Sequence, residues 1–491
     1  MSLARRHLLQ LAAPAALAAA APQARSQQPL TSPAAPEGVA DYTLRIGVGL
    51  VELGHDTIVS TKLYSDQFPG PLLRLKEGQR VTVDIHNDTD TPEQLHWHGQ
   101  FVGTDVDGAA EEGTPFIPPR GSRRISFVPK PAGYRFYHTH VRAGANLSAG
   151  QYSGQVGPVY IEPASNPGNY DREVFLTLKE FEPTFSRGGD MAMDFLAPAT
   201  TVEELKNQGE SAMKESLAKG MPHGFEVGYG SFTINGRMLG SGEPVQVKQG
   251  ERVLFHVLNG SATEIRSLAL PGHIFDVVAL DGNPIAKPVS VPGLWLGTGE
   301  RVSAIVEMNH PGAWIMGDTA NDDREHGMGI VVEYAGKSGK PQWVAPKKFS
   351  WNYAKFGNGG AAPPAPDQTF DMTFAKQNAA QDGFNLWTIN GVAFSEQHMQ
   401  PLFRVTEGKR YRLRMRNASD DIHPIHLHRH SFELTRVAGQ PVSGVRKDVA
   451  MVGGYQELEV DFVADNPGLT LFHCHQQLHM DFGFMALFEY S

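Results

Sequence analysis

The chain has 491 residues, a net charge of −10 at pH 7 and one cysteine. The acidic balance argues against a nucleic-acid partner and gives no attraction to an anionic membrane surface, and one cysteine excludes an internal disulfide. Its 52 glycines and 34 prolines, among many short β-branched runs, favour an all-β protein. The length is enough for about three domains.

The first residues have the form of an export signal. Arg5 and Arg6 precede a short apolar run, rich in alanine and leucine, that extends to Ala21. A charged start, a short apolar stretch and small residues are typical of a cleaved signal, and the run is too short for a good membrane span. The arginine pair indicates a twin-arginine signal, with an ordinary secretory signal as the alternative. We therefore expect residues 1–26 to be a signal peptide and the protein to be periplasmic or extracellular.

A strand, a glycine turn and a second strand recur three times along the chain, and each time an asparagine follows, namely Asn87, Asn259 and Asn417. Further along, each of the three repeats also has a Pro-Gly or Pro-Ala-Gly turn near its end. We call these repeats the three copies. Three copies of one β-sandwich unit are the simplest interpretation. We expect them at residues 40–165, 170–336 and 345–491.

Two stretches depart from the repeat. Residues 186–229 form a polar insert in the second copy, where Thr201 followed by two acids predicts the capped start of a helix. Residues 357–367, rich in Gly, Ala and Pro, are the expected linker between the second and third copies. The methionines singled out in the insert are Met191, Met193, Met213 and Met221.

Ten of the twenty histidines fall in four short clusters. The clusters are His96-Trp97-His98-Gly99, His138-Thr139-His140, His423-Pro424-Ile425-His426-Leu427-His428, and His473-Cys474-His475 followed by His479. Histidines two residues apart on a strand lie on one face, so each pair can serve one metal site. Clustered histidine and cysteine side chains are typical metal ligands, and core packing explains their grouping poorly.

The second copy acts as an internal control for this interpretation. It has Trp314-Ile315-Met316-Gly317 where the third copy has Phe472-His473-Cys474-His475, and the first copy also has histidines there. The sandwich therefore does not need the histidines, and we expect the single His273 of the second copy to be structural.

Cys474 is the centre of the predicted site. Because strand side chains alternate, His473 and His475 face one way, about 6–7 Å apart, and Cys474 faces the other. A small buried core residue is the alternative role for a lone cysteine. If Cys474 binds a metal, this tripeptide joins two metal sites through covalent bonds, which suits electron transfer between them.

In order, spacing and position, the four clusters resemble the copper-binding signatures of the multicopper oxidases. The resemblance implies three cupredoxin-like Greek-key β-sandwich domains and four coppers, one blue type 1, one type 2 and two type 3. Two imidazoles and a thiolate form a blue-copper site, which we assign to His423, Cys474 and His479. The resemblance gives His96 and His426 to the type 2 copper. It gives the type 3 pair to His98, His138, His140, His428, His473 and His475.

Two further positions tune the predicted chemistry. The family's axial position, ten residues after the cysteine, holds Phe484, which cannot ligate, so we expect a fairly high redox potential, with Met485 as an alternative ligand. Asp107 matches the family's acid near the cluster and would relay protons or tune a bound water; a plain Asp-Gly turn is the alternative. Met480 stands where several bacterial relatives have a glutamate, which puts a second relay there in doubt.

Arg429 and His430 lie outside the motif pattern. We expect them to support the ligands or to lie on the surface.

The resemblance implies a laccase-type oxidase. Phenols or aromatic amines would give up single electrons, through His479, and dioxygen would take four to become water. A metal oxidase that converts Cu(I) to Cu(II) is the alternative, favoured by the methionines of the insert but not by any dense methionine tract. A copper-free scaffold is a third possibility that the full ligand set disfavours. We hypothesise that the insert at 186–229 covers the blue site.

Overall fold

The computed structural model describes residues 37–165, 168–186, 201–359 and 364–491. The predicted leader, Met191 and Met193 of the insert and part of the predicted linker lie outside these ranges. Within the described ranges, no helix is long and apolar enough to cross a membrane.

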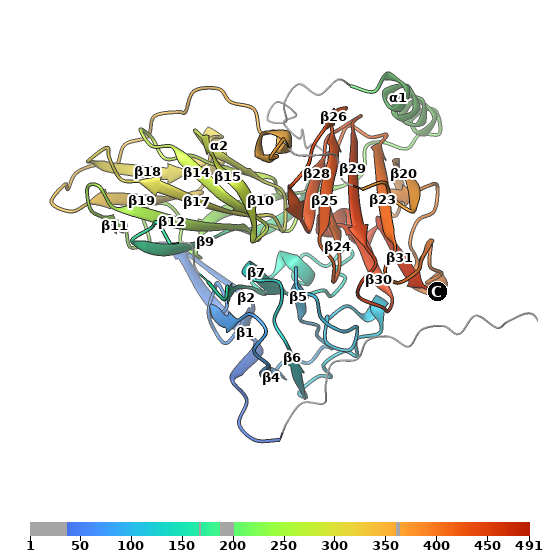
Figure 1. Ribbon diagram of the computed structural model, residues 1–491, viewed down its shortest axis with the longest axis horizontal. Coiled ribbons are helices and arrows are strands. Elements are labelled where there is room, and N and C mark those ends of the chain that lie inside the picture. The colour runs from blue at the N-terminus through green and yellow to red at the C-terminus, as the bar shows by residue number, and fades with distance from the viewer. Residues whose placement is uncertain (1–36, 166–167, 187–200, 360–363) are drawn as a thin grey trace, which may run out of the picture.

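The chain folds into three β-sandwiches, which confirms the predicted all-β architecture (Figure 1). In the first copy, one sheet has the order β2-β1-β4-β6 and the other β3-β8-β7-β5. The strands are β1 (Tyr42–Gly54), β2 (Thr57–Tyr64), β3 (Leu73–Lys76), β4 (Val81–Asn87), β5 (His96–His98), β6 (Ser122–Phe127), β7 (Gly133–His138) and β8 (Val156–Glu162), with 3-10 turns at Ala110–Glu112 and Gly150–Tyr152.

The second copy, in green and yellow, has a sheet of order β10-β9-β12-β17-β14-β15, a sheet β11-β19-β18 and a small sheet β13-β16 (Figure 1). Its elements are β9 (Arg172–Ser186), α1 (Glu203–Ala218), β10 (Glu226–Ile234), β11 (Val245–Val247), β12 (Arg252–Asn259), β13 (Arg266–Leu268), β14 (Phe275–Leu280), β15 (Asn283–Val291), β16 (Leu294–Leu296), β17 (Arg301–Glu307), β18 (Ala313–Gly317), α2 (Asn321–Glu325) and β19 (Gly329–Tyr334).

The third copy, in orange and red, has one sheet of order β21-β20-β23-β29-β25-β26, to which β27 adds, and a second of order β22-β31-β30-β24-β28 (Figure 1). Its elements are a 3-10 turn at Tyr353–Phe356, β20 (Gln368–Gln381), β21 (Phe384–Ile389), a 3-10 turn at Glu396–His398, β22 (Phe403–Val405), β23 (Arg410–Asn417), β24 (His423–Leu427), β25 (Phe432–Val437), β26 (Gln440–Pro441), β27 (Arg446–Lys447), β28 (Val449–Val452), β29 (Glu457–Val463), β30 (Thr470–Cys474), α3 (Gln477–Asp481) and β31 (Met485–Tyr490).

The same connections recur in all three copies. The parallel pairs β1/β4, β9/β12 and β20/β23 correspond, as do β3/β8, β11/β19 and β22/β31. Strand β23 shows why the sequence forms them: its apolar residues alternate with arginines, so one face packs in the core and the other meets the acids of β29.

The repeated asparagines hold equivalent loops. Asn87, Asn259 and Asn417 are fully buried. Each donates its side-chain amide to backbone carbonyls across the loop and accepts the N–H of the second residue after it. These bonds satisfy buried backbone groups that no strand can pair, so the asparagine repeat is structural.

The insert begins its helix later than predicted. We expected Thr201 to cap it, but the N-cap of α1 is Val202, without a side-chain cap. The Val202 N–H donates to the Tyr455 carbonyl of the third copy, and the Val202 carbonyl accepts the first helical bond. A contact with another copy, rather than a local side chain, therefore sets the start of α1.

His273 of the second copy is structural, as predicted. It is buried, with its Nδ1 at 2.8 Å from the Pro271 carbonyl and its Nε2 at 2.5 Å from the Tyr334 hydroxyl. Both ring nitrogens are therefore satisfied by protein groups.

Candidate metal centre

Cys474 and two histidines converge at one end of the third copy. The Cys474 Sγ lies 3.7 Å from His423 Nδ1 and 3.5 Å from His479 Nδ1, and the two nitrogens are 3.2 Å apart. In the antiparallel pairing of β24 with β30, Ile425 lies opposite Cys474, and His423, two residues before Ile425, is on the same face. The short helix α3 then brings His479 close to the sulfur. All three side chains are buried, so three possible ligand atoms surround one point away from water.

Burial decides the protonation of this group. It raises the pKa of the Cys474 thiol and lowers the pKa of His479 to about 4. The Ser419 hydroxyl donates to Asn417, so at 3.0 Å it accepts from His423 Nε2. The lone pair of His423 is therefore left on Nδ1, which faces the thiol. Two neutral imidazoles aimed at a sulfur suit a bound cation, which would also stabilise the thiolate.

The predicted axial residue lies at this site. Phe484 is fully buried, and its ring centre is 4.8 Å from that of His423. Phe484 packs in the same apolar cluster as Cys474, whereas Met485 packs in a different cluster with Leu471 and Met480. The alternation of side chains along the chain thus sends Met485 away from the sulfur.

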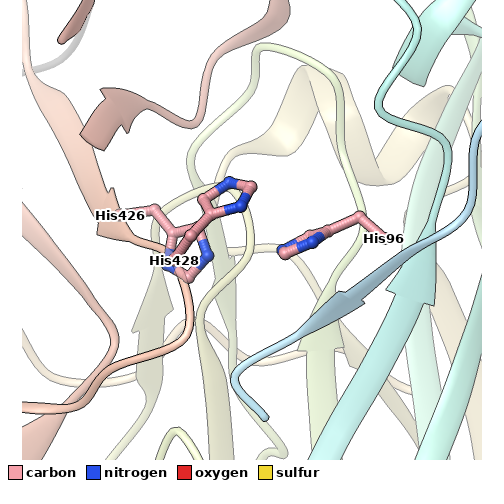
Figure 2. A group of neighbouring side chains, drawn as sticks. All are labelled: His96, His426 and His428. Carbon is pink, nitrogen blue, oxygen red and sulfur yellow. The ribbon is translucent and has the colours of Figure 1, made fainter. Parts of the chain in front are cut away.

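Eight other histidines meet between the first and third copies. Figure 2 shows His96, from a strand of the first copy, facing His426 and His428 of the third. The pairing of β5 with β7 sets His96 opposite His138, and that of β24 with β30 sets His426 opposite His473. All eight are buried, and they are His96, His98, His138, His140, His426, His428, His473 and His475. The structure thus brings together every cluster histidine that the sequence predicted to share a site.

Hydrogen bonds fix the tautomer of most of these rings. The Nδ1–H groups of His96, His138, His426 and His473 donate to backbone carbonyls at 2.7–2.9 Å. His428 Nδ1 instead donates to the Asp107 carboxylate at 2.9 Å. Because burial lowers the pKa of His138, His426 and His428 well below the usual range, these rings are neutral and each Nε2 carries a lone pair.

Those lone pairs face one another without protons between them. His428 Nε2 lies 3.0 Å from His473 Nε2, and both Nδ1 atoms already donate elsewhere. The Nε2 atoms of His96, His138, His140 and His426 have no hydrogen-bond partner among the described residues. Buried polar atoms are normally satisfied. A cation between the rings satisfies them all, so the donor set fits a metal cluster of imidazole ligands.

Asp107 lies against this cluster, as predicted. Its Oδ2 is 2.9 Å from His428 Nδ1 and 3.1 Å from His96 Nδ1, while its Oδ1 has no hydrogen-bond partner in the described part of the chain. Asp107 also ends a turn, because its N–H donates to the Gly103 carbonyl, and Gly108 must be glycine, because at φ +100° a Cβ would lie 2.0 Å from the Leu95 carbonyl. The turn and the contact with the ligands therefore coexist.

The sequence analysis missed a second acid, Glu112. It is buried, its Oε1 accepts the Leu471 N–H at 2.6 Å, and it lies 3.6 Å from His428 Nδ1. Burial, and then the neighbouring Asp107, raises the pKa of Glu112 well above its usual range. No motif marks Glu112, since only the fold brings the 3-10 turn of the first copy against β30.

Arg429 and His430 are buried, so the surface alternative for them was wrong. The Arg429 guanidinium donates to the carbonyls of Val102, Asn466, Pro467 and Leu469. His430 lies between the His428 carbonyl and the Tyr490 hydroxyl. Arg429 thus ties the chain before β30 to the first copy.

The approach to the cysteine site is covered. His479 is 2% exposed, and the Trp387 ring centre lies 4.3 Å from its own. Trp387 belongs to β21, the hairpin partner of β20, and α1 of the insert packs on β20. Met213 of α1 has its Sδ 2.6 Å from Asn378 Nδ2. The insert therefore crosses from the second copy onto the hairpin that carries Trp387.

Comparison with protein families gives a consistent result over nearly all of the chain. Three family models, each described as multicopper oxidase, match residues 51–166, 200–334 and 361–491. A multicopper oxidase of Mycobacterium tuberculosis, MmcO, is 30% identical over 459 residues, which are 90% of this chain and 85% of that protein.

Solved structures share the fold. A laccase from Botrytis aclada matches with a TM-score of 0.72 and 19% identity, over 92% of this chain and 87% of its own. A multicopper oxidase from Campylobacter jejuni, described as a metallo-oxidase, matches with a TM-score of 0.68 and 18% identity, over 94% of each chain. At these identities the likeness supports the cupredoxin-like architecture and nothing about substrate.

Proposed function

Because this chain belongs to the multicopper oxidase family, a family of copper oxidoreductases, we propose that it is a laccase-type enzyme. It oxidises phenols and aromatic amines one electron at a time at a blue copper and reduces dioxygen to water at a three-copper cluster. The convergence of Cys474 with His423 and His479 carries the proposal, because a buried thiolate with two imidazoles favours copper.

We assign the ligands as follows. His423, Cys474 and His479 would hold the blue copper, and His96 and His426 the type 2 copper. The type 3 pair would be held by His98, His138, His140, His428, His473 and His475. Bound there, copper would supply one-electron oxidation of the reductant and the four-electron reduction of dioxygen.

The tripeptide His473-Cys474-His475 would connect the two sites. His473 and Cys474 are buried in β30, between β24 and β31, and the N–H of the next residue, His475, donates to the Pro424 carbonyl at 2.7 Å. These pairings fix the spacing between the sulfur and the imidazoles. This segment would give a short covalent path of fixed length between the residues that hold the two copper sites, which suits single-electron transfer between them.

Asp107 would handle protons beside the cluster. Its Oδ2 accepts the Nδ1–H of His428 and lies 3.1 Å from His96 Nδ1, and its Oδ1 has no hydrogen-bond partner among the described residues. A carboxylate with one engaged and one free oxygen can keep its orientation while it accepts and passes on a proton. The reduction of dioxygen to water requires such a supply.

Phe484 would set the potential of the blue site. The Phe484 ring would offer no sulfur ligand to a bound copper, so the reduced ion would be favoured and the potential would be fairly high. Electrons would enter through His479 and the adjoining Trp387 ring, and the insert would shape that entrance because α1 packs on the same hairpin. We also propose export, on the form of the leader.

A metal oxidase that acts on Cu(I) is the second candidate. Met213 of α1 contacts Asn378 of the hairpin that carries Trp387. The charge of Asp421 raises the pKa of His479, so a thioether and a carboxylate both lie near the proposed electron entrance at His479. Lys376 pairs with Asp421 at 2.6 Å and with Asp420 at 2.8 Å, which weakens the attraction for a cation. The laccase-type assignment is therefore preferred.

Oxygen consumption separates the two candidates. Copper-loaded protein is given a methoxyphenol or chelated Cu(I), and the phenol assay is repeated with added Cu(II). Fast phenol oxidation that does not respond to added Cu(II) is the expected result. A preference for Cu(I), with phenol oxidation only in the presence of Cu(II), would overturn the laccase-type assignment in favour of the metal oxidase.

A further inference from the structure

Six charged side chains are buried where the three copies meet. Three are cations and three are anions, so the group is neutral overall, and none is more than 2% exposed. They are Arg135, Asp281, Glu300, Arg301, Lys447 and Asp448. We call them the junction cluster. Placing this many charges away from water is unfavourable unless every one is paired.

Asp448 is the centre of the junction cluster. Arg301, on β17 of the second copy, donates to both of its oxygens, from Nη1 at 2.6 Å and from Nη2 at 2.7 Å. Arg135, on β7 of the first copy, donates to Oδ2 at 3.1 Å. The Asp448 N–H donates to Asp281 Oδ2 at 3.2 Å. One carboxylate of the third copy is thus held by cations from the other two.

Two of the eight histidines of the candidate metal cluster, His426 and His98, contact Asp448. His426 Nδ1 donates to the Asp448 backbone carbonyl at 2.7 Å. His98 Nε2 lies 3.1 Å from the Asp448 carboxylate. An ionised carboxylate only accepts hydrogen bonds, so the Nε2 of His98 carries the N–H that Asp448 accepts.

His98 is consequently reversed relative to its neighbours. His96, His138, His426 and His473 anchor Nδ1 and present Nε2, but His98 anchors Nε2 and presents Nδ1, which lies 3.3 Å from His475 Nε2. Without Asp448, nothing else among the described contacts of His98 would select this ring orientation.

The neighbouring backbone is shaped to fit the junction cluster. Gly99 follows His98 and has a φ of +76°. A Cβ there would lie 2.5 Å from Asp448 Oδ2 and 2.8 Å from Arg301 Nη2. The glycine that ends the first histidine motif therefore lets the carboxylate and guanidinium approach the strand that carries His98.

We propose that Arg301, from the second copy that has no ligands of its own, is a positioning residue for the copper cluster. The two hydrogen bonds from its guanidinium fix the Asp448 carboxylate. Asp448 in turn determines which ring nitrogen of His98 faces the other histidines of the metal cluster. Buried ion pairs add little net stability compared with apolar packing, whereas groups that orient metal ligands change metal affinity by about 10- to 100-fold. This inference rests on the proposed function, since it requires copper at the eight histidines.

The test compares copper retention in matched variants. Arg301→Lys keeps the charge but loses the planar two-point contact, and Asp448→Asn keeps the volume but loses the charge. Arg266→Lys is the control: Arg266 is also a buried arginine of the second copy, bonded to Asp323 at 2.6 Å, and contacts no cluster histidine. Each copper-loaded protein is titrated with a chelator while the blue absorption band and copper per chain are followed.

We expect R301K and D448N to lose cluster copper at about 10- to 100-fold lower chelator concentration than the unmodified protein. The blue band should be unchanged, and R266K should behave like the unmodified protein. Thermal unfolding of the copper-free proteins separates stability from retention, and R301K and R266K should differ in retention even where their unfolding temperatures agree.

Retention by R301K and D448N equal to that of the unmodified protein would overturn the inference and leave the proposed function standing. A loss shared equally by R301K and R266K would also overturn it, since that indicates general destabilisation. If the unmodified protein itself holds no copper at the eight histidines, the proposed function fails and the inference fails with it.

Discussion

The second and third copies each have a loop held by a buried asparagine, but only the loop of the third copy contacts a candidate metal ligand. Asn259 and Asn417 are both buried, and both donate to carbonyls on either side of the loop. In the third copy the loop held this way places Ser419 on His423. In the second copy the corresponding residue is Ser261, whose N–H bonds to Asn259 and whose hydroxyl has no partner among the described residues. The framework is thus independent of the metal ligands that it carries.

The strands that follow show the same contrast. In β30 of the third copy, His473 and Cys474 are buried side by side between two neighbouring strands. The corresponding part of β18 in the second copy has Ile315 and Met316, and it lies at the edge of its sheet. An apolar pair suffices to build the strand, so the strand itself does not require the histidine and cysteine of the third copy. The second copy contributes Arg301 to the junction cluster instead.

The largest change should come from removing the sulfur that distinguishes β30 from β18. Cys474→Ser keeps the volume but removes the soft ligand, so the blue absorption band should vanish. Reductant oxidation should fall at least about 1000-fold, equal to ~4 kcal/mol in the activation barrier. Steady-state oxygen uptake and an optical spectrum measure both. A variant that keeps its blue band would show that Cys474 is a core residue.

Replacing one histidine of the third copy and one of the second tests directly whether, of these two copies, only the third binds copper. His428→Ala removes the 2.9 Å hydrogen bond to Asp107 and one imidazole from the cluster, so cluster copper and oxygen reduction should be lost. His273→Ala removes two protein–protein hydrogen bonds and should lower the free energy of unfolding by about 2 kcal/mol, with full copper content. Copper analysis and denaturant unfolding of both variants are the measurements. Equal copper loss in the two variants would contradict the distinction between the copies.

The acid beside the cluster should have a smaller effect. Asp107→Asn keeps an oxygen for His428 but cannot accept a proton, so kcat should fall about 100-fold. The measurement is kcat for oxygen uptake across a range of pH, with copper content as the control. If Asp107 only forms the turn, kcat and its pH profile will match those of the unmodified protein.

The smallest effect should be on the potential of the blue site. Phe484→Met supplies a thioether in the axial position, which should stabilise Cu(II) and lower the reduction potential. Met485→Leu is the matched control, because Met485 packs in a separate cluster and should leave the potential unchanged. Redox titration of the blue band measures both. An unchanged or raised potential in F484M would remove Phe484 from the axial position.

The sequence predicted the sandwich repeats and the grouping of the motif histidines because these depend on local spacing. Alternation along a strand is enough to separate Cys474 from His473 and His475. The resemblance to the multicopper oxidases, and not spacing, predicted that Asp107 lies beside the cluster and that histidines of the first and third copies meet.

Contacts between copies could not be predicted in the same way. Glu112, Arg301 and Asp448 come from three different copies, and nothing in the neighbouring sequence marks them. Val202 replaces Thr201 as the helix cap because Tyr455 of another copy holds it. Arg429 reaches the Val102 carbonyl of the first copy, whereas the partners of His430 lie within the third copy, one of them at Tyr490, 60 residues away in sequence. Only the assembled fold reveals such residues.

The central claim is that the terminal copies hold copper and the middle copy does not. The most direct test is an anomalous difference map from a crystal of the copper-loaded protein, recorded at the copper absorption edge. We predict one peak between His423, Cys474 and His479, three peaks among the eight cluster histidines, and none in the second copy. A map with no peak at Cys474, or with a peak beside His273, would contradict it.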